Sequence, residues 1–197
     1  MKAPEYQALA IRTAKMFQDL EKDLNHAVLG IVSETGELAE TVNAIWMDLP
    51  PKEGQSHQDN MKEEIGDASW YPALACTIFG WKFEDLIIAD QQHVRELDFA
   101  LFKASSVMSP VAVHECMTGF AGELATQFKA LYVYGKPLNE DKFKKYLSLF
   151  VTATAMLCEI NQIEYADALE YNIAKLRKRF PNAYSDADAL ARADKAA

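Results

Sequence analysis

The chain has 197 residues, 50% of them hydrophobic and 25% charged, and its formal net charge is −9. This composition supports a folded core and excludes a largely disordered protein, and the excess of acids argues against a general nucleic-acid or membrane-surface binder. Its three cysteines show no CxxC spacing, so we expect them to be reduced core residues. No apolar run is long enough for a signal sequence or a membrane span. We therefore expect a cytoplasmic protein without nucleic-acid or membrane partners.

Apolar residues recur at helical spacing along almost the whole chain, whereas the alternating pattern typical of strands is missing. The sequence therefore predicts an all-α fold, a helical bundle. Segments that contain Pro, Gly or Ser interrupt the pattern and mark the loops. We expect helices at residues 4–23, 25–48, 59–79, 83–104, 109–134, 139–161 and 164–179, and a weak last turn after Pro181.

The two halves of the chain resemble each other. Gly36-Glu-Leu-Ala39 recurs as Gly122-Glu-Leu-Ala125, and similar matches follow in the next helix of each half. We interpret this as a tandem duplication, with one unit at residues 1–104 and a second at 105–197, together forming one compact fold. Chance similarity between two amphipathic helices is the alternative.

Two of the predicted helices carry pairs of acids at i, i+3 spacing, which places both carboxylates of a pair on one helical face. The pairs are Glu34 with Glu37 and Glu64 with Asp67, and an apolar segment follows the second pair directly. Two carboxylates at roughly 5 Å and an effective dielectric of about 20 repel by about 3 kcal/mol. Four converging acids would therefore take up protons or hold a divalent metal, and we favour the metal. A solvated helix face is the alternative.

The acids have no counterparts in the second half of the chain. The alignment of the halves pairs Glu34, Glu64 and Asp67 with Phe120, Tyr146 and Leu149. The second unit would therefore have lost the acidic site and filled its place with apolar side chains.

Near the C-terminus, Asn172, Lys175 and Arg179 have the spacing i, i+3, i+7 and share one helical stripe. Lysine and arginine suit phosphate oxygens, and an amide can orient a sugar or a phosphate. The alternative is that cations in a last helical turn complement the helix dipole.

Trp70 adjoins the second acid pair and is a candidate for stacking on a nucleobase, although an aromatic residue at that position is also typical of a core. Gly36 and Gly66 lie inside the acid motifs, and glycine costs about 1 kcal/mol in a helix relative to alanine. Either the close approach of a ligand or close helix packing would explain them.

With these residues, the chain resembles the MazG-like all-α nucleoside triphosphate pyrophosphohydrolases, which are related to dimeric dUTPases. The matching text is Ser33-Glu-Thr-Gly-Glu37-Leu-Ala-Glu40, Glu63-Glu-Ile-Gly-Asp67 with Trp70-Tyr71, and Asn172-x-x-Lys175-Leu-x-x-Arg179. The resemblance implies that Glu34, Glu37, Glu64 and Asp67 bind Mg²⁺, with Mn²⁺ as the expected substitute. It also implies hydrolysis of a nucleoside triphosphate substrate to the monophosphate and pyrophosphate.

The chain departs from the family pattern in two ways. A whole second unit separates the acid motifs from the C-terminal Asn-Lys-Arg motif. The lysine that follows Glu-x-x-Glu in relatives is replaced by Asn43, whereas Lys129 in the second unit resembles it.

We therefore expect a pseudo-dimer of two MazG-like units with one composite site, in which the first unit supplies acids as metal ligands and catalytic groups. The second unit would supply the substrate-binding Asn172, Lys175 and Arg179, with Lys129 as a weaker candidate. A homodimer of such pseudo-dimers is a further expectation. Two alternatives stay open: a base-selective enzyme similar to dUTPases or dCTPases, and a non-catalytic helical binding or regulatory protein.

Overall fold

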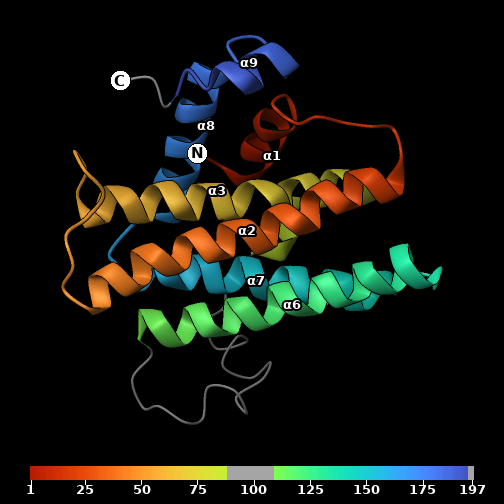
Figure 1. Cartoon of the computed structure of the whole chain (residues 1–197), viewed down its shortest axis with the longest axis horizontal. Helices are drawn as coiled ribbons and strands as arrows, with labels where there is room; N and C mark the ends of the chain where they lie inside the picture. Colours follow the sequence, from red (N-terminus) through yellow and green to blue (C-terminus); the bar gives the residue numbers. More distant parts are fainter. Residues whose placement is uncertain (88–108, 195–197) are drawn as a thin grey trace.

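The computed structural model describes residues 1–87 and 109–194, and in these ranges the chain is all-α, with no β-strand. Figure 1 shows long helices crossing the molecule side by side, with shorter helices gathered on one side of them. The elements are α1 (Ala3–Ile11), α2 (Leu20–Trp46), α3 (His57–Phe79), a 3-10 turn η1 (Phe83–Leu86), α6 (Pro110–Tyr134), α7 (Glu140–Ile160), α8 (Tyr165–Arg179) and α9 (Asp186–Ala191).

The predicted helices from the second onward match α2, α3, α6, α7 and α8 to within a few residues at most ends, and α9 is the expected weak last turn. The predicted helix at 83–104 is seen only as the turn η1, and from residue 88 it lies outside the described residues.

The predicted first helix at 4–23 is wrong. Helix α1 ends at Ile11, because the carboxylate of Asp23 accepts hydrogen bonds from the backbone N–H groups of Phe17 (2.7 Å) and Asp19 (3.4 Å) and holds that segment in a turn. Asp19 then caps α2 by accepting a hydrogen bond from the N–H of Lys22. Helix α2 therefore begins at Leu20, inside the range that the sequence pattern assigned to the first helix.

Four long helices form the bundle: α2 packs on α3 and α6, and α7 packs on α6 and α3 (Figure 1). Two hairpins, α2–α3 and α6–α7, make up the bundle. Both have fully buried side chains on their inward faces, because apolar residues repeat with helical periodicity along each helix. Helices α1 and α8 cover the side of α3 that faces away from α6. Among the buried residues of the bundle are Leu24, Ile31, Leu38, Met61, Ile65, Met117, Leu147 and Phe150.

The second hairpin, α6–α7, is apolar at the positions aligned with the acids. Phe120 is 6% exposed and Leu149 7% exposed, and the ring of Phe120 lies 6.4 Å from that of Tyr146. Phe120 and Leu149 are therefore buried as expected, whereas Tyr146 is half-buried. The duplication itself stays an interpretation of the sequence.

Gly66 lets α8 approach α3 closely. A Cβ atom at this position would lie 2.7 Å from the Cβ of Asn172 and 2.9 Å from the carbonyl oxygen of Ala168. From α1, the Tyr6 hydroxyl donates to Asn172 Oδ1 (3.0 Å) and also lies 3.2 Å from the Gly66 carbonyl oxygen. Close helix packing therefore explains Gly66, whereas a Cβ at Gly36 would meet no atom within 4 Å.

None of the helices in the described part of the chain combines the length and the apolar character needed to cross a membrane.

The contrast between the two glycines is testable. We expect Gly66→Ala to lower the free energy of unfolding by about 1–3 kcal/mol, because the new methyl group overlaps α8. Gly36→Ala is the matched control and should gain up to about 1 kcal/mol from its better helix propensity. Urea unfolding followed by circular dichroism measures both. Equal stability of Gly66→Ala and the parent would show that α8 does not pack on α3 at this point.

Candidate functional site

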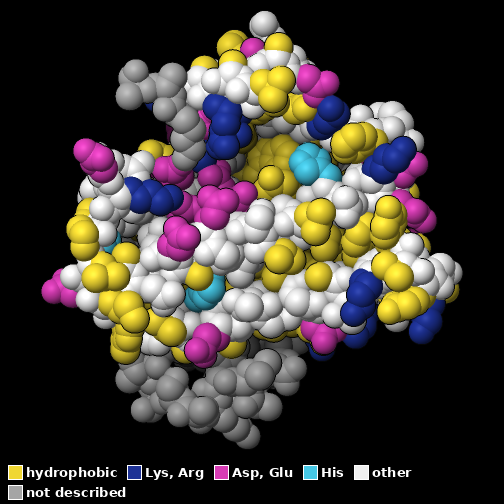
Figure 2. All heavy atoms as spheres, in the orientation of Figure 1, with side chains coloured by type: hydrophobic (Ala, Val, Ile, Leu, Met, Phe, Trp, Pro, Cys, Tyr) yellow, Lys and Arg dark blue, Asp and Glu magenta, His cyan; other side chains and the backbone are white. Residues whose placement is uncertain are grey.

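A pocket of about 950 Å³ opens between α2, α3 and α8 and extends to the segment that follows α1. Figure 2 shows acidic side chains gathered beside basic ones at the pocket, next to a hollow lined by hydrophobic side chains and a histidine. The pocket therefore has a charged end and an aromatic end.

Three carboxylates meet at the charged end. One oxygen each of Glu34 and Glu37 on α2 and of Glu64 on α3 lie within 4.8 Å of one another. Glu64 is only 2% exposed, and its Oε2 atom has no hydrogen-bond partner among the described residues. A buried carboxylate with an unpartnered oxygen, close to two further carboxylates, fits a divalent cation with oxygen ligands.

The electrostatics of this cluster point the same way. Burial, followed by the charges of Asp67, Glu37 and Glu64, raises the pKa of Glu34 to about 8. Burial also raises the pKa of Glu64, although a hydrogen bond from Lys52 opposes the shift. Glu64 is buried, Glu34 is half-buried and Glu37 is exposed, and a bound cation would relieve the repulsion among the three carboxylates.

Asp67, expected as a fourth ligand, is engaged otherwise in the structure. Its Oδ1 accepts from Asn172 Nδ2 at 2.7 Å, and its Oδ2 pairs with Lys175 Nζ. Lys175 also lies 3.3 Å from Glu63 Oε1 and is 11% exposed. Asp67 therefore lies beside the three-carboxylate group, and a metal ion that used it would compete with Lys175.

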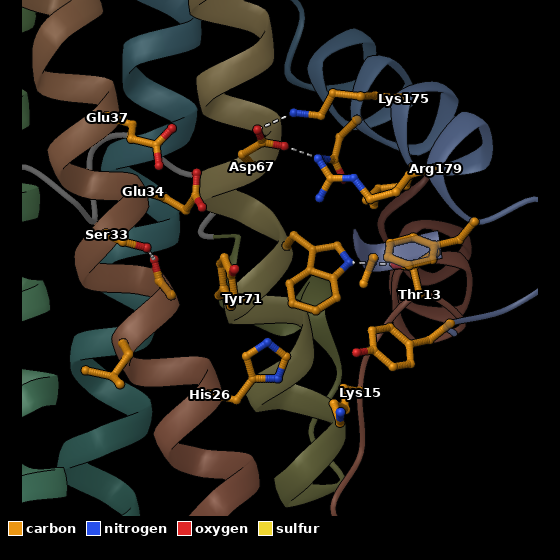
Figure 3. A pocket seen from close by; sticks show the side chains of 18 of the residues that line it. Thr13, Lys15, His26, Ser33, Glu34, Glu37, Asp67, Tyr71, Lys175 and Arg179 are labelled. Atoms are coloured by element: carbon orange, nitrogen blue, oxygen red, sulfur yellow. Dashed lines mark hydrogen bonds and ion pairs between the residues drawn. The ribbon is translucent and has the colours of Figure 1, made fainter. Parts of the chain in front are cut away.

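The structure brings cations of α8 to the side of the pocket that holds the acids. Figure 3 shows Lys175 and Arg179 extending from α8 toward the side of the pocket that holds Asp67. Arg179 makes a two-point ion pair with Asp194, with Nε–Oδ1 at 2.6 Å and Nη2–Oδ2 at 2.5 Å. Asn172 is 1% exposed and bonded to Tyr6 and Asp67, so it orients Asp67 in this structure.

Trp70 lies at the boundary between core and pocket. It is 8% exposed, and its indole N–H donates to Thr13 Oγ1 (3.0 Å) and to the Ala10 carbonyl (3.2 Å). Its ring meets Tyr71 edge-on at 4.7 Å and lies 5.7 Å from His26. The aromatic end is completed by residues that sequence reasoning missed because they come from separate elements, namely Phe17, His26, Phe180 and Tyr184.

Lys129 does not belong to the site. It is exposed on α6, which packs against α2 and α7, and it is not among the pocket residues. The expectation that it contacts substrate is wrong for this structure, because the motif similarity that suggested it says nothing about which face of α6 it occupies. Lys52, which the sequence analysis missed, instead reaches Glu64 from the loop between α2 and α3.

Comparisons with known proteins add little chemistry. No family model matches the chain, and no solved structure matches it. It is similar to the Gene 37 protein of Mycobacterium phage L5, with 34% identity over 55 residues. The match covers 28% of this chain and 48% of that protein, so it spans about half the length of the relative.

The raised pKa of Glu34 predicts a pH dependence of stability. In the unfolded chain Glu34 loses its proton near its ordinary pKa of 4.5, whereas in the folded protein it keeps it until about pH 8. As the pH rises through this window the unfolded state binds fewer protons than the folded state, so stability falls. We expect Glu34→Gln to flatten the decline in melting temperature between pH 5 and pH 8, measured in EDTA.

Glu40→Gln, on an exposed turn of the same helix, is the matched control and should follow the parent curve. If Glu34→Gln declines as steeply as the parent, Glu34 does not hold a proton in the folded protein.

Proposed function

We propose that this protein is a Mg²⁺-dependent nucleotide pyrophosphohydrolase that converts a (d)NTP into the (d)NMP and pyrophosphate. The observation that carries the proposal is the three-carboxylate group of Glu34, Glu37 and Glu64, set in one pocket with the cations Lys175 and Arg179. The volume of about 950 Å³ suits a small-molecule ligand of nucleotide size.

The carboxylates would hold the metal, with Asp67 joining if it exchanges Lys175 for the ion. Oxygen ligands of this kind are those that Mg²⁺ prefers. When bound, Mg²⁺ would supply positive charge for the phosphate oxygens and lower the pKa of a water molecule. We assign the role of proton acceptor to Glu34 or Glu37.

The remaining side chains bind and orient the nucleotide in this proposal. Lys175 and Arg179 would neutralise phosphate oxygens as water attacks the α-phosphorus, the bond to the bridging oxygen breaks and pyrophosphate leaves with both electrons of that bond. Asn172 would hold Asp67 in place through its 2.7 Å hydrogen bond. Because phosphoryl transfer depends chiefly on positioning and charge neutralisation, this set of groups is sufficient.

The aromatic end supports a nucleotide over inorganic polyphosphate as the ligand. His26, Trp70 and Tyr71 form a wall of the pocket in which a base would meet ring faces and edges. A base-selective activity similar to that of dUTPases or dCTPases is the form of the proposal that this wall favours.

The resemblance to MazG-like pyrophosphohydrolases supports the same proposal. Under this proposal, residues 1–104 and 105–197 would be the two units of a pseudo-dimer in a cytoplasmic enzyme, and a homodimer of such pseudo-dimers would be its further assembly. One observation favours the alternative of a non-catalytic binding protein: Asp67 and Glu64 are already paired with lysines.

The deciding experiment is pyrophosphate release from a panel of ribo- and deoxyribonucleoside triphosphates. We expect release with Mg²⁺ or Mn²⁺, none in EDTA, and a preference for one base that reports on the aromatic end. No release from any nucleotide with either metal would overturn the proposal and favour the binding protein.

The metal assignment makes a prediction of its own. Glu64→Gln and Glu37→Gln should lower turnover by about 100-fold or more, since losing an outer-shell partner alone typically costs 10–100-fold. Mg²⁺ should raise the melting temperature of the parent but not of these variants, because only a ligand that binds the folded state stabilises it.

Glu123→Gln is the control, because Glu123 occupies the position of Glu37 in the second half and pairs with Lys142 at 3.1 Å outside the pocket. It should behave as the parent does. Normal turnover of Glu64→Gln at saturating Mg²⁺ would remove Glu64 from the metal site.

The phosphate assignment is tested by Arg179→Ala. Loss of a charge-assisted contact worth about 1.5–4 kcal/mol should reduce kcat/KM roughly tenfold to a thousandfold. Lys178→Ala removes a neighbouring exposed cation of α8 that does not line the pocket, and it should leave kcat/KM close to that of the parent. Equal losses in both variants would show that only the general charge of α8 matters.

A further inference from the structure

The loop between α2 and α3 sends one cation into the acid cluster. Lys52 Nζ pairs with Oε1 of Glu64, while Oε2 of the same carboxylate has no partner among the described residues. The Lys52 side chain is 42% exposed, whereas that of Glu64 is 2% exposed. The partly exposed side chain of Lys52 therefore places its ammonium group against the buried carboxylate of Glu64.

Lys52 and a divalent metal would compete for the same group. Glu64 is one of the three carboxylates that converge within 4.8 Å, so an ion held there would lie close to the ammonium and repel it. The lysine can leave without disturbing the core, because its side chain is partly exposed and most residues of the loop around it are exposed. Gln55 keeps the loop attached, since its side-chain amide donates to Glu63 Oε2 at 3.0 Å.

Two further cations near the acids come from a different element. Lys175 and Arg179 come from α8, and they pair with Asp67 and Asp194. Lys52 comes from the loop between α2 and α3 and pairs with Glu64. A polyphosphate lying over the acid cluster would therefore meet a cation from this loop in addition to those of α8.

We propose that Lys52 is an exchangeable cation of this site: it holds Glu64 until a metal ion takes that carboxylate, and it then moves to phosphate oxygens of the bound ligand. This inference rests on the proposed function for the identity of the ligand. It makes Lys52 a phosphate-binding residue on a loop, in addition to those on α8.

The test has two arms, neither of which needs turnover. In the first, the protein is treated with EDTA, dialysed and titrated with Mn²⁺ alone, and free Mn²⁺ is measured by electron paramagnetic resonance. Lys52→Ala should bind Mn²⁺ roughly 3–30-fold more tightly than the parent, because the ion no longer has to displace an ammonium from Glu64.

In the second arm, inorganic tripolyphosphate is titrated at saturating Mn²⁺ by calorimetry. Here Lys52→Ala should bind roughly tenfold more weakly, because a charge-assisted phosphate contact is lost. The opposite signs of the two effects identify exchange, since a merely structural ion pair would not change both affinities in this way. Lys52→Arg keeps a cation and should restore tripolyphosphate binding at least in part.

Lys142→Ala is the matched control, because it removes a half-exposed lysine that pairs with a glutamate, Glu123, away from the pocket. It should leave both affinities unchanged. If Lys52→Ala leaves Glu64 unpaired and unfolds, Lys52→Met keeps the apolar stem and serves as the second neutral variant.

Unchanged or weaker Mn²⁺ binding in the neutral variants would overturn the proposal, as would unchanged tripolyphosphate binding. Failure of the hydrolase proposal is separate: the nucleotide panel could show no pyrophosphate release while both arms succeed, and the exchange role of Lys52 would then stand. A parent protein that binds no Mn²⁺ would overturn both.

Discussion

The close contact between α3 and α8 at Gly66 is the constraint on which the pocket depends. The missing side chain allows α8 to lie against α3, and the Tyr6 hydroxyl from α1 joins the contact through Asn172. Asn172 and Lys175 then reach Asp67, more than a hundred residues away in sequence. A bulkier residue at Gly66 would move the cations away from the acids and leave buried carboxylates without compensation.

The acid cluster lowers the stability of the folded protein. Glu34, Glu37 and Glu64 repel one another, and the high pKa of Glu34 follows first from burial and then from the charges of the neighbouring acids. Lys52 and Lys175 offset part of the cost at Glu64 and Asp67. Groups held in this balance respond strongly to an added cation, which is why such clusters are typical of binding and catalytic sites.

The sequence predicted the long helices and the pairing of acids on one face of each helix, because both follow from periodicities within single helices. It predicted four converging acids, of which three meet in the structure. It failed at the first helix, where hydrogen bonds from the backbone N–H groups of Phe17 and Asp19 to the Asp23 carboxylate override the apolar pattern. It could not find Lys52 or Asp194, since each pairs with a pocket residue from an irregular segment whose path is set by tertiary packing. For Asp67, the sequence predicted a place beside the other acids but not the ion pair with Lys175.

The asymmetry of the bundle follows from the path of α8. This helix comes directly after α7, yet it packs mainly on α3 of the first hairpin. Its cations therefore lie with the acids of the first hairpin, and the second hairpin keeps apolar side chains such as Phe120 and Leu149 at the aligned positions. Two hairpins in one chain can differ in this way, whereas identical chains in a symmetric dimer cannot. The second hairpin thus packs apolar side chains that stabilise the fold, while the first hairpin carries the three carboxylates that repel one another.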